Sequence, residues 1–276
     1  MEIWKVVATR IERAAGAGIF GTDASGYDRA RADYPAEMFD AIEEYAGGIR
    51  GSRIFEVGAG TGIASRALLA REPARLSLIE PDPVLARGLQ QVGFETVASP
   101  FETAELPARG YDIGLAASCI HWVEPEGSHI RARELLRPDG TWAICWNVYR
   151  SADIGDAFAD IMVRRLAALP LPPSEAADRH YSLDEAKHRE DLRAAGFTDV
   201  RFHIWRRERL LSGEEIRSLY ASFSFVRALP ERERMLLLDE IANLVRSEFG
   251  GSAPNVVLTP LYLARAPAGS NEALRS

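Results

Sequence analysis

The chain has 276 residues, of which 47% are hydrophobic and 26% are charged, and its formal net charge is −7. An acidic globular composition without a long basic run argues against tight, sequence-independent binding to nucleic acid. No run approaches the roughly 18 apolar residues that a membrane helix requires, and the amphipathic start is a poor secretion signal, so we expect a cytoplasmic protein. Cys119 and Cys145 lie in apolar segments, which predicts buried thiols rather than a disulfide or a metal site.

From about residue 50, short apolar runs alternate with helical patterns, which predicts a parallel sheet with crossover helices. The predicted strands are Arg53–Val57, Arg75–Glu80, Phe94–Ala98, Tyr111–Ala117 and Thr141–Asn147. The predicted helices between them are Ala64–Arg71, Pro83–Gln91 and Glu126–Arg137. In "LLRPDG", Pro138 is expected to stop the last of these helices, and Asp139-Gly140 to turn the chain.

After Asn147 the alternation breaks, and helical patterns dominate. We expect helices near Ile154–Leu169 and Ser182–Ala195, a proline-rich loop at "LPLPPSE", and a long strand in "AGFTDVRFHIWRRERL". A later helix has a core-facing stripe formed by Leu238, Ile241, Ala242, Val245 and Phe249. "NVVLTPLYLARA" reads as the last strand, in which Pro260 must lose a ladder hydrogen bond and is expected to cause an interruption or bulge.

The stretch "IFEVGAGTG" predicts a ligand site at the end of the first strand. Gly58, Gly60 and Gly62 would let a ligand approach the backbone closely, and Glu80 ends the second strand, where a carboxylate can accept hydrogen bonds from ribose hydroxyls. Glycines that merely turn the chain and a solvated acid are the alternative. Both features on one strand–turn–helix favour a nucleoside-containing ligand.

A glycine turn of this kind can bind several cofactors, and two residues of this chain indicate which one it binds. The dinucleotide fingerprint requires a third glycine three positions after the second, where this chain has Ile63. Glu56, two residues before the first glycine, would repel a pyrophosphate but would attract an ammonium group. S-adenosylmethionine carries an ammonium group and a sulfonium and no phosphate, so the sequence favours it over NAD.

The segments "FEVGAGTG", "IEPDP", "FETAELP", "YDIGLAASCIHW" and "RELLRPDGTWAI" occur in this order. The chain thereby resembles the class I S-adenosylmethionine-dependent methyltransferases, most strongly over residues 26–147, and within them the type 11 branch near the trans-aconitate methyltransferase-like proteins. The resemblance implies an α/β fold: a Rossmann-like, seven-stranded, mostly parallel sheet with an antiparallel last strand, plus a helical lid.

The resemblance also implies a set of residues that bind the cofactor: Tyr27, Arg31, Glu56, Gly58, Ala59, Gly60, Glu80, Pro81, Phe101, Glu102, Ala117 and Ser118. Glu56, in place of the commoner aspartate, would orient the methionyl end, and Glu80 would bind the ribose diol. Phe101 would pack on adenine from a surface loop. Arg31 would close over the methionyl carboxylate, whereas Ser118 stands where a longer amide is frequent.

Methyl transfer from a sulfonium is an in-line displacement with a neutral leaving group, so alignment can supply most of the catalysis, roughly 7–11 kcal/mol. His121, just beyond the fourth strand, could act as a general base if the acceptor must lose a proton, or could only form a wall of the pocket. Trp146, Arg150, Tyr220 and Phe223 are candidates to contact the acceptor, because aromatic rings suit a small organic molecule and Arg150 could pair with a carboxylate.

The predicted organisation assigns each part of the chain to the sheet or to its cover. Residues 1–50 form an N-terminal helical cover, residues 51–150, 196–210 and 254–267 the sheet core, and residues 151–195 and 211–253 the helical lid insertions. We expect O-methylation of a carboxylate or hydroxyl of a small organic molecule. A catalytically silent regulator of the same fold and an NAD(P)-dependent oxidoreductase are the alternatives, and the oligomeric state is left open.

Overall fold

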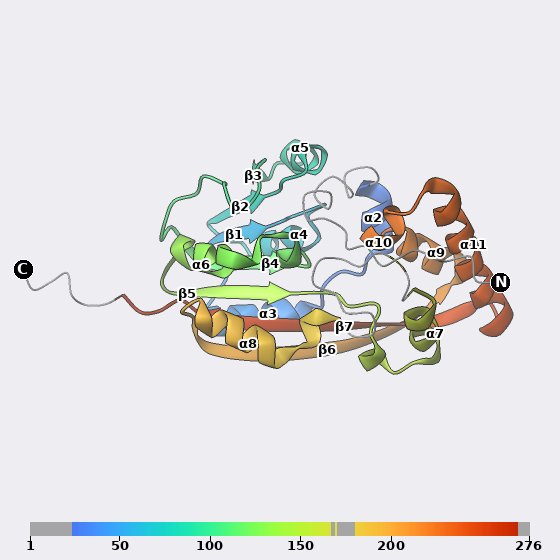
Figure 1. The fold of residues 1–276 in the computed structure, drawn as a ribbon. Helices are drawn as coiled ribbons and strands as arrows, with labels where there is room; N and C mark the ends of the chain where they lie inside the picture. Colours follow the sequence, from blue (N-terminus) through green and yellow to red (C-terminus); the bar gives the residue numbers. More distant parts are fainter. Residues whose placement is uncertain (1–23, 167–168, 170–179, 270–276) are drawn as a thin grey trace, which may run out of the picture. The chain divides into compact units, whose positions relative to one another are not determined.

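A computed structural model describes residues 24–166, 169 and 180–269, and its chain divides into two compact units (Figure 1). We call residues 34–146, 184–203 and 260–269 the core unit, and the described parts of 24–33, 147–183 and 204–259 the helical unit. Residues 1–23 of the predicted N-terminal cover and most of the proline-rich loop lie outside the described residues.

The sheet has seven strands in the order β3-β2-β1-β4-β5-β7-β6. Their bounds are β1 Arg53–Val57, β2 Arg75–Ile79, β3 Glu95–Val97, β4 Tyr111–Ala117, β5 Leu136–Cys145, β6 Thr198–Ser212 and β7 Ser252–Arg265. Strands β1 to β5 pair in parallel, and β7 pairs antiparallel with β5. The predicted Rossmann-like sheet with an antiparallel last strand is therefore confirmed.

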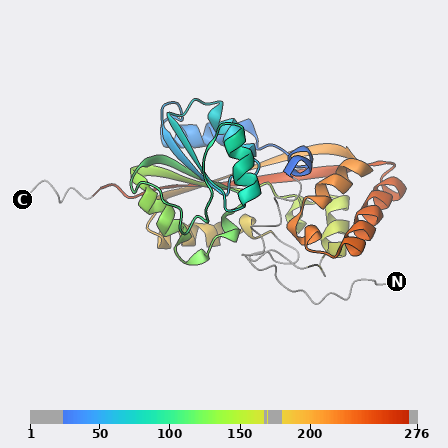
Figure 2. The ribbon, with the colours of Figure 1, turned by 90° about the horizontal axis from the view of Figure 1, so that it is seen from above.

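Helices of the core unit cover both faces of its sheet, so that α3 and α6 lie on opposite faces in Figures 1 and 2. These helices are α3 Ala36–Ala46, α4 Ile63–Leu69, α5 Pro83–Gln91, α6 Pro125–Leu135 and α8 Glu185–Ala194. α5 begins where the sequence predicted, because Asp82 caps it by accepting hydrogen bonds from the amides of Val84 and Leu85, and Pro83 fits the first helical position.

The helical unit contains α2 Ala24–Ala30, α7 Ala157–Leu166, α9 Gly213–Ala221, α10 Ser224–Arg227 and α11 Glu231–Glu248. α9 and α11 pack closely, because Gly213 lacks the Cβ that would lie 3.1 Å from the carbonyl oxygen of Ala242. Leu238, Ile241 and Val245 of α11 are buried, so the predicted stripe packs into a core as expected.

The start of β5 corrects one prediction. "LRPDG" is not a separate turn, because β5 begins at Leu136 directly after α6, and buried Leu136 pairs with Tyr111 of β4. The next pair is Ile113 with Thr141, so the residues between bulge out of the ladder, and Asp139 takes the left-handed conformation with φ of 60°. The burial of Leu136 and its pairing with Tyr111 start the strand before Asp139-Gly140, so the local turn signal of these two residues does not end it.

Pro260 does not shift the register of β7 against its neighbour. Cys145 lies opposite Leu261, and Val148 lies opposite Leu258, so the same register holds on both sides of the proline. Pro260 accepts a 3.2 Å hydrogen bond from the amide of Trp146 through its carbonyl oxygen. It cannot donate one in return, so the expected loss of a ladder hydrogen bond is present but the expected bulge is not.

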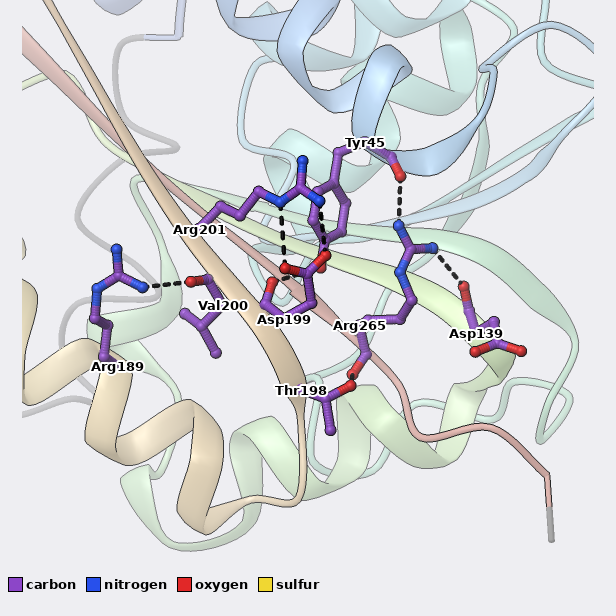
Figure 3. A network of polar contacts seen from close by, with 8 residues as sticks. All are labelled: Tyr45, Asp139, Arg189, Thr198, Asp199, Val200, Arg201 and Arg265. Carbon is purple, nitrogen blue, oxygen red and sulfur yellow. Dashed lines mark hydrogen bonds and ion pairs between the residues drawn. The ribbon is translucent and has the colours of Figure 1, made fainter.

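A polar network fixes the first residues of β6 to the core unit (Figure 3). The Tyr45 hydroxyl of α3 donates a 2.7 Å hydrogen bond to the Asp199 carbonyl oxygen, and Arg265 of β7 donates one of 2.5 Å to the Tyr45 carbonyl oxygen. The guanidinium groups of Arg265 and Arg201 lie 4.4 and 4.9 Å from the centre of the Tyr45 ring. Burial, followed by the charge of Asp199, raises the pKa of Tyr45 to about 12, so the phenol stays a hydrogen-bond donor.

Candidate cofactor and active site

The glycine turn between β1 and α4 is built by left-handed backbone, with φ of 59° at Gly58, 61° at Gly60 and 84° at Gly62. A Cβ on Gly58 would lie 2.6 Å from the Cβ of Cys119, so packing as well as conformation requires glycine there. A Cβ on Gly60 would meet nothing nearer than the Gly58 carbonyl oxygen at 3.9 Å. Gly60 thus lies beside open space, as a backbone that a ligand approaches should.

Glu80 follows β2 and is held beside this turn. Its Oε2 accepts a 2.7 Å hydrogen bond from the amide of Gly60, and its Oε1 accepts one of 2.9 Å from the amide of Asp82. The side chain is 4% exposed, and burial raises its pKa although both amide bonds act in the opposite direction. Each carboxylate oxygen has two acceptor positions, so each can still accept from a hydroxyl, and this donor set fits a ribose diol.

Glu56 lies on β1 beneath the turn and is 1% exposed. The Ser65 hydroxyl of α4 donates a 2.7 Å hydrogen bond to its Oε2. Burial raises the pKa of Glu56 to about 8, with a smaller contribution from the nearby charge of Glu80. A ligand ammonium group would favour the ionised carboxylate and offset that burial, so the site fits the methionyl end of S-adenosylmethionine. The sequence analysis missed Ser65. The available signal is its position: it is a hydroxyl residue in the first turn of the helix that follows the glycine turn.

The segment after β4 closes the other side of the glycine turn. Ser118 has φ of 55°, which is strained for a residue with a Cβ, and its hydroxyl lies 2.8 Å from the Tyr34 hydroxyl. The Cys119 thiol donates a 2.8 Å hydrogen bond to the Val57 carbonyl oxygen, and burial raises its pKa well above the ordinary value, so it stays a thiol. Tyr34 was missed by the sequence analysis, although it lies only three residues after the predicted cofactor residue Arg31.

His121 lies in a short 3-10 helix, Ile120–Trp122, immediately after this segment. Its ring is half-buried and its centre lies 5.1 Å from that of Trp122, at a tilt of 41°. The expected roles of general base and pocket wall both stay predictions. Ala117 is half-buried at the end of β4, and Pro81 is half-buried between Glu80 and Asp82. Ala59 is 7% exposed and donates a 3.1 Å hydrogen bond to the Ile79 carbonyl oxygen.

Phe101 corrects one expectation, because its ring is buried in the core and is not exposed on a surface loop, whereas its predicted contact with adenine stays a prediction. It is 3% exposed and stacks on Phe55, with ring centres 6.2 Å apart and an angle of 13° between the planes. Arg131 lies 5.6 Å from the ring centre and donates a 2.7 Å hydrogen bond from Nε to the Phe101 carbonyl oxygen. The Phe101 ring therefore packs on the apolar surface of Phe55. The next residue, Glu102, is exposed.

Trp146, a predicted acceptor residue, is buried in the core unit. It is 1% exposed and packs against Tyr262 of β7 and His188 of α8, with ring centres 6.2 and 5.2 Å away. The ring belongs to the core unit beside α8, and its predicted contact with an acceptor stays a prediction. The structure places the other three predicted acceptor residues in the helical unit.

Arg31 is surrounded by aromatic rings of the helical unit. Its guanidinium carbon lies 5.0, 5.1 and 4.4 Å from the ring centres of Tyr27, Tyr149 and Phe223. Nη2 donates a 3.2 Å hydrogen bond to the Ser222 carbonyl oxygen, whereas the buried Nε has no hydrogen-bond partner among the described residues. The structure thus brings the predicted cofactor residues Tyr27 and Arg31 together with the predicted acceptor residue Phe223; Tyr149 was missed.

Arg150 is a second guanidinium in this group, 5% exposed and 5.4 Å from the ring centre of Phe225. Phe225 stacks on Phe223 at 5.2 Å, and Tyr220 meets Phe223 edge-on at 5.0 Å. Burial raises the pKa of Tyr220, although the charge of Arg150 acts in the opposite direction. We call the following residues the aromatic cluster: Tyr27, Arg31, Tyr149, Arg150, Tyr220, Phe223 and Phe225.

Comparisons with known proteins agree with this geometry. A family model described as a methyltransferase domain matches residues 55–144. An uncharacterised methyltransferase-like protein of Schizosaccharomyces pombe is 28% identical over 82% of this chain and 86% of its own, and an uncharacterised methyltransferase of Mycobacterium bovis is 26% identical over 82% and 85%.

Solved structures show the same fold. One from Anaeromyxobacter dehalogenans, described as a type II methyltransferase, has a TM-score of 0.61 and 22% identity, and covers 87% of this chain and 99% of its own. A phosphoethanolamine N-methyltransferase of Haemonchus contortus, solved with S-adenosylhomocysteine, has a TM-score of 0.51 and 10% identity, and covers 92% and 57%.

Together, the matched domain and the relatives define the class of protein. The chain is an enzyme, an S-adenosylmethionine-dependent methyltransferase. Its cofactor is S-adenosyl-L-methionine. The matched domain and the relatives named as methyltransferases favour neither a silent regulator nor an NAD(P)-dependent oxidoreductase. Among the described residues, no helix is long and apolar enough to cross a membrane, and no group of His, Cys, Asp and Glu side chains could hold a metal ion.

Proposed function

We propose that the enzyme methylates an oxygen atom of a small organic acid, either its carboxylate or a hydroxyl group. The aromatic cluster carries this proposal, because two guanidinium groups lie on aromatic rings in an environment of low exposure. Such rings bind the apolar body of a small molecule, and a guanidinium can bind a carboxylate with two parallel hydrogen bonds. The resemblance to the trans-aconitate methyltransferase-like branch adds support and stays a prediction.

The proposal divides the work between named residues. Glu80 and the Gly58–Gly60 backbone bind the nucleoside, and Glu56 binds the methionyl ammonium. Arg31 binds the methionyl carboxylate through its buried Nε, which has no partner among the described residues. Arg150, with Tyr220 and Phe223, binds the acceptor. The predicted lid segments 151–195 and 211–253 would then choose the acceptor, and the protein would work in the cytoplasm without nucleic acid.

Methyl transfer requires little from the protein beyond the alignment of the acceptor with the methyl group. When bound, S-adenosylmethionine supplies an electrophilic methyl group with a neutral leaving group. The residues of this chain hold the acceptor oxygen in line and exclude water. A carboxylate acceptor is already a nucleophile at neutral pH, so His121 would only shape the site, whereas a hydroxyl acceptor would need His121 to remove its proton.

The deciding experiment measures S-adenosylhomocysteine formation with a panel of small carboxylic acids, hydroxy acids, phenols and amines. Acids are expected to be methylated, and Arg150→Gln should raise the acceptor KM by about tenfold or more, since a hydrogen bond to a charged group contributes about 1.5–3 kcal/mol. Arg31→Gln should instead weaken S-adenosylhomocysteine binding in the absence of acceptor. Arg232→Gln, at an exposed position of α11, is the control. Turnover of amines alone would contradict the acid proposal.

A further inference from the structure

β6 lies at the edge of the sheet, with β7 as its only neighbour among the described strands (Figure 1). It is 15 residues long, and within it Ile204, Arg206, Glu208 and Leu210 are all exposed, at alternate positions of one face. Ile204 is 47% exposed and Leu210 is 72% exposed. Arg206 Nη1 donates a 2.9 Å hydrogen bond to Glu208 Oε2, which shows that both side chains lie on that face.

An exposed edge can pair with the same edge of a second copy. Such a pairing is antiparallel and symmetric about one residue, because a two-fold axis normal to the sheet relates the strands. Residues at equal distances before and after the central residue then lie directly opposite one another on the same face. Each possible centre therefore fixes every opposing pair.

Among the possible centres near the middle of the exposed stretch, only one places each of the four side chains opposite a complementary partner. With Arg207 at the centre, Arg206 lies opposite Glu208 and Ile204 lies opposite Leu210, and each pair occurs twice. A centre at Arg206 or at Glu208 would place that charge against its own copy, and a centre at Trp205 would place Arg206 against Ile204.

The other face of the strand accepts the same centre. The two Arg207 residues would lie directly opposite each other at the centre. However, Nη2 of Arg207 donates a 2.7 Å hydrogen bond to the Asp33 carbonyl oxygen and one of 3.3 Å to Asn147 Oδ1. These bonds hold the guanidinium within its own helical unit. Trp205 would lie opposite Arg209, a pair that suits a cation–π contact.

We propose that two copies of this chain form a dimer through antiparallel pairing of their β6 strands, centred on Arg207. Charged residues on an edge strand ordinarily prevent pairing with other chains. On the exposed face the charges are complementary in the register centred on Arg207 and repulsive in the two registers centred on its neighbours, so they select the first of these registers.

A charge-swap series tests the proposal by analytical ultracentrifugation of the full chain. The unaltered protein is expected to be a dimer that dissociates on dilution. Arg206→Glu and Glu208→Arg should each shift it to monomer, because like charges then face each other twice. The double variant Arg206→Glu/Glu208→Arg should restore the dimer. Arg232→Glu, on α11, makes the same charge change as Arg206→Glu and should leave the dimer intact. A monomer at every concentration that stays in solution, or a dimer unaffected by the single reversals, would overturn the proposal.

A cysteine pair tests the register itself. Ile204→Cys/Leu210→Cys should give a disulfide-linked dimer under mild oxidation, because each new thiol lies opposite its complement in the second copy. Ile204→Cys/Glu208→Cys places the thiols out of register and is the control. Equal cross-linking in both variants, or none in the first when it is dimeric, would contradict the centre at Arg207.

Discussion

The backbone amide of Gly60 donates a 2.7 Å hydrogen bond to Oε2 of Glu80, which joins the glycine turn after β1 to the end of β2. One carboxylate thus positions the turn and still has acceptor positions for a ligand. Removal of Glu80 should therefore affect the backbone geometry of the site as well as the direct contact.

Glu80→Ala is expected to weaken S-adenosylhomocysteine binding by about 1.5–3 kcal/mol, the range for hydrogen bonds to a charged group. Isothermal titration calorimetry measures it, and the same titration should show no heat with NADH. Glu95→Ala removes a carboxylate from β3 that forms a surface ion pair with Arg75 and is the matched control. Equal affinity in Glu80→Ala and the unaltered enzyme would remove Glu80 from the site.

Gly58→Ala and Gly60→Ala should separate folding from binding. Both positions have nearly the same φ, 59° and 61°, so the conformational cost of alanine is similar. Only the Gly58 variant also meets Cys119, at 2.6 Å, so it should lower the melting temperature more. Gly60→Ala should keep more stability but lose cofactor affinity, because its methyl group enters the open space. Thermal denaturation and calorimetry on both variants provide the comparison.

Phe101→Ala is expected to destabilise the fold by about 3–5 kcal/mol, the usual range for removing a buried phenylalanine. The ring stacks on Phe55, which itself stacks on Trp142 at 5.7 Å, so truncation leaves a cavity in the core. Urea unfolding measures the change. Glu102→Ala, at the exposed neighbouring position, should leave stability almost unchanged. A Phe101→Ala variant of unaltered stability with weak cofactor binding would reinstate the adenine contact.

Glu56 should make stability fall as pH rises. Its pKa is about 8 in the folded protein, against about 4.3 in an unfolded chain, so its contribution is fully present below about pH 4. That contribution is lost progressively as the pH rises from about 4 to about 8, because the unfolded chain releases this proton in that range whereas the buried carboxyl of the folded state retains it. Relative to Glu56→Gln, the enzyme should lose melting temperature between about pH 5 and 8. A constant difference across that range would contradict the assignment.

Cofactor binding should release a proton at pH 7. An ammonium group beside Glu56 favours the ionised carboxylate, whereas the free enzyme holds it protonated because of burial. Titrations with S-adenosylhomocysteine in two buffers of different ionisation enthalpy should show release approaching one proton, and Glu56→Gln should abolish it. Identical heats in both buffers would place the ammonium group elsewhere.

The sequence predicts the elements better than the contacts. β1, β4 and α5 have the predicted bounds, because apolar runs, an Asp cap and a proline mark them locally. The same pattern that marks a pocket wall also marks a core aromatic, so Phe101 and Trp146 could not be distinguished from pocket residues by sequence. Tyr34 and Ser118 meet across 84 positions of the chain, a distance over which no local pattern carries information.

The division of the chain has a consequence for how new specificities could arise. The helical unit is assembled from separate stretches, at residues 24–33, 147–183 and 204–259, and the chain passes through β6 and β7 from one unit into the other. No single cut releases this unit, so it cannot be exchanged between enzymes as a cassette. Under the proposal that the helical unit chooses the acceptor, altered acceptor choice, in evolution or by engineering, would come through individual side-chain replacements, each made while β6 and β7, which run through both units, stay in register.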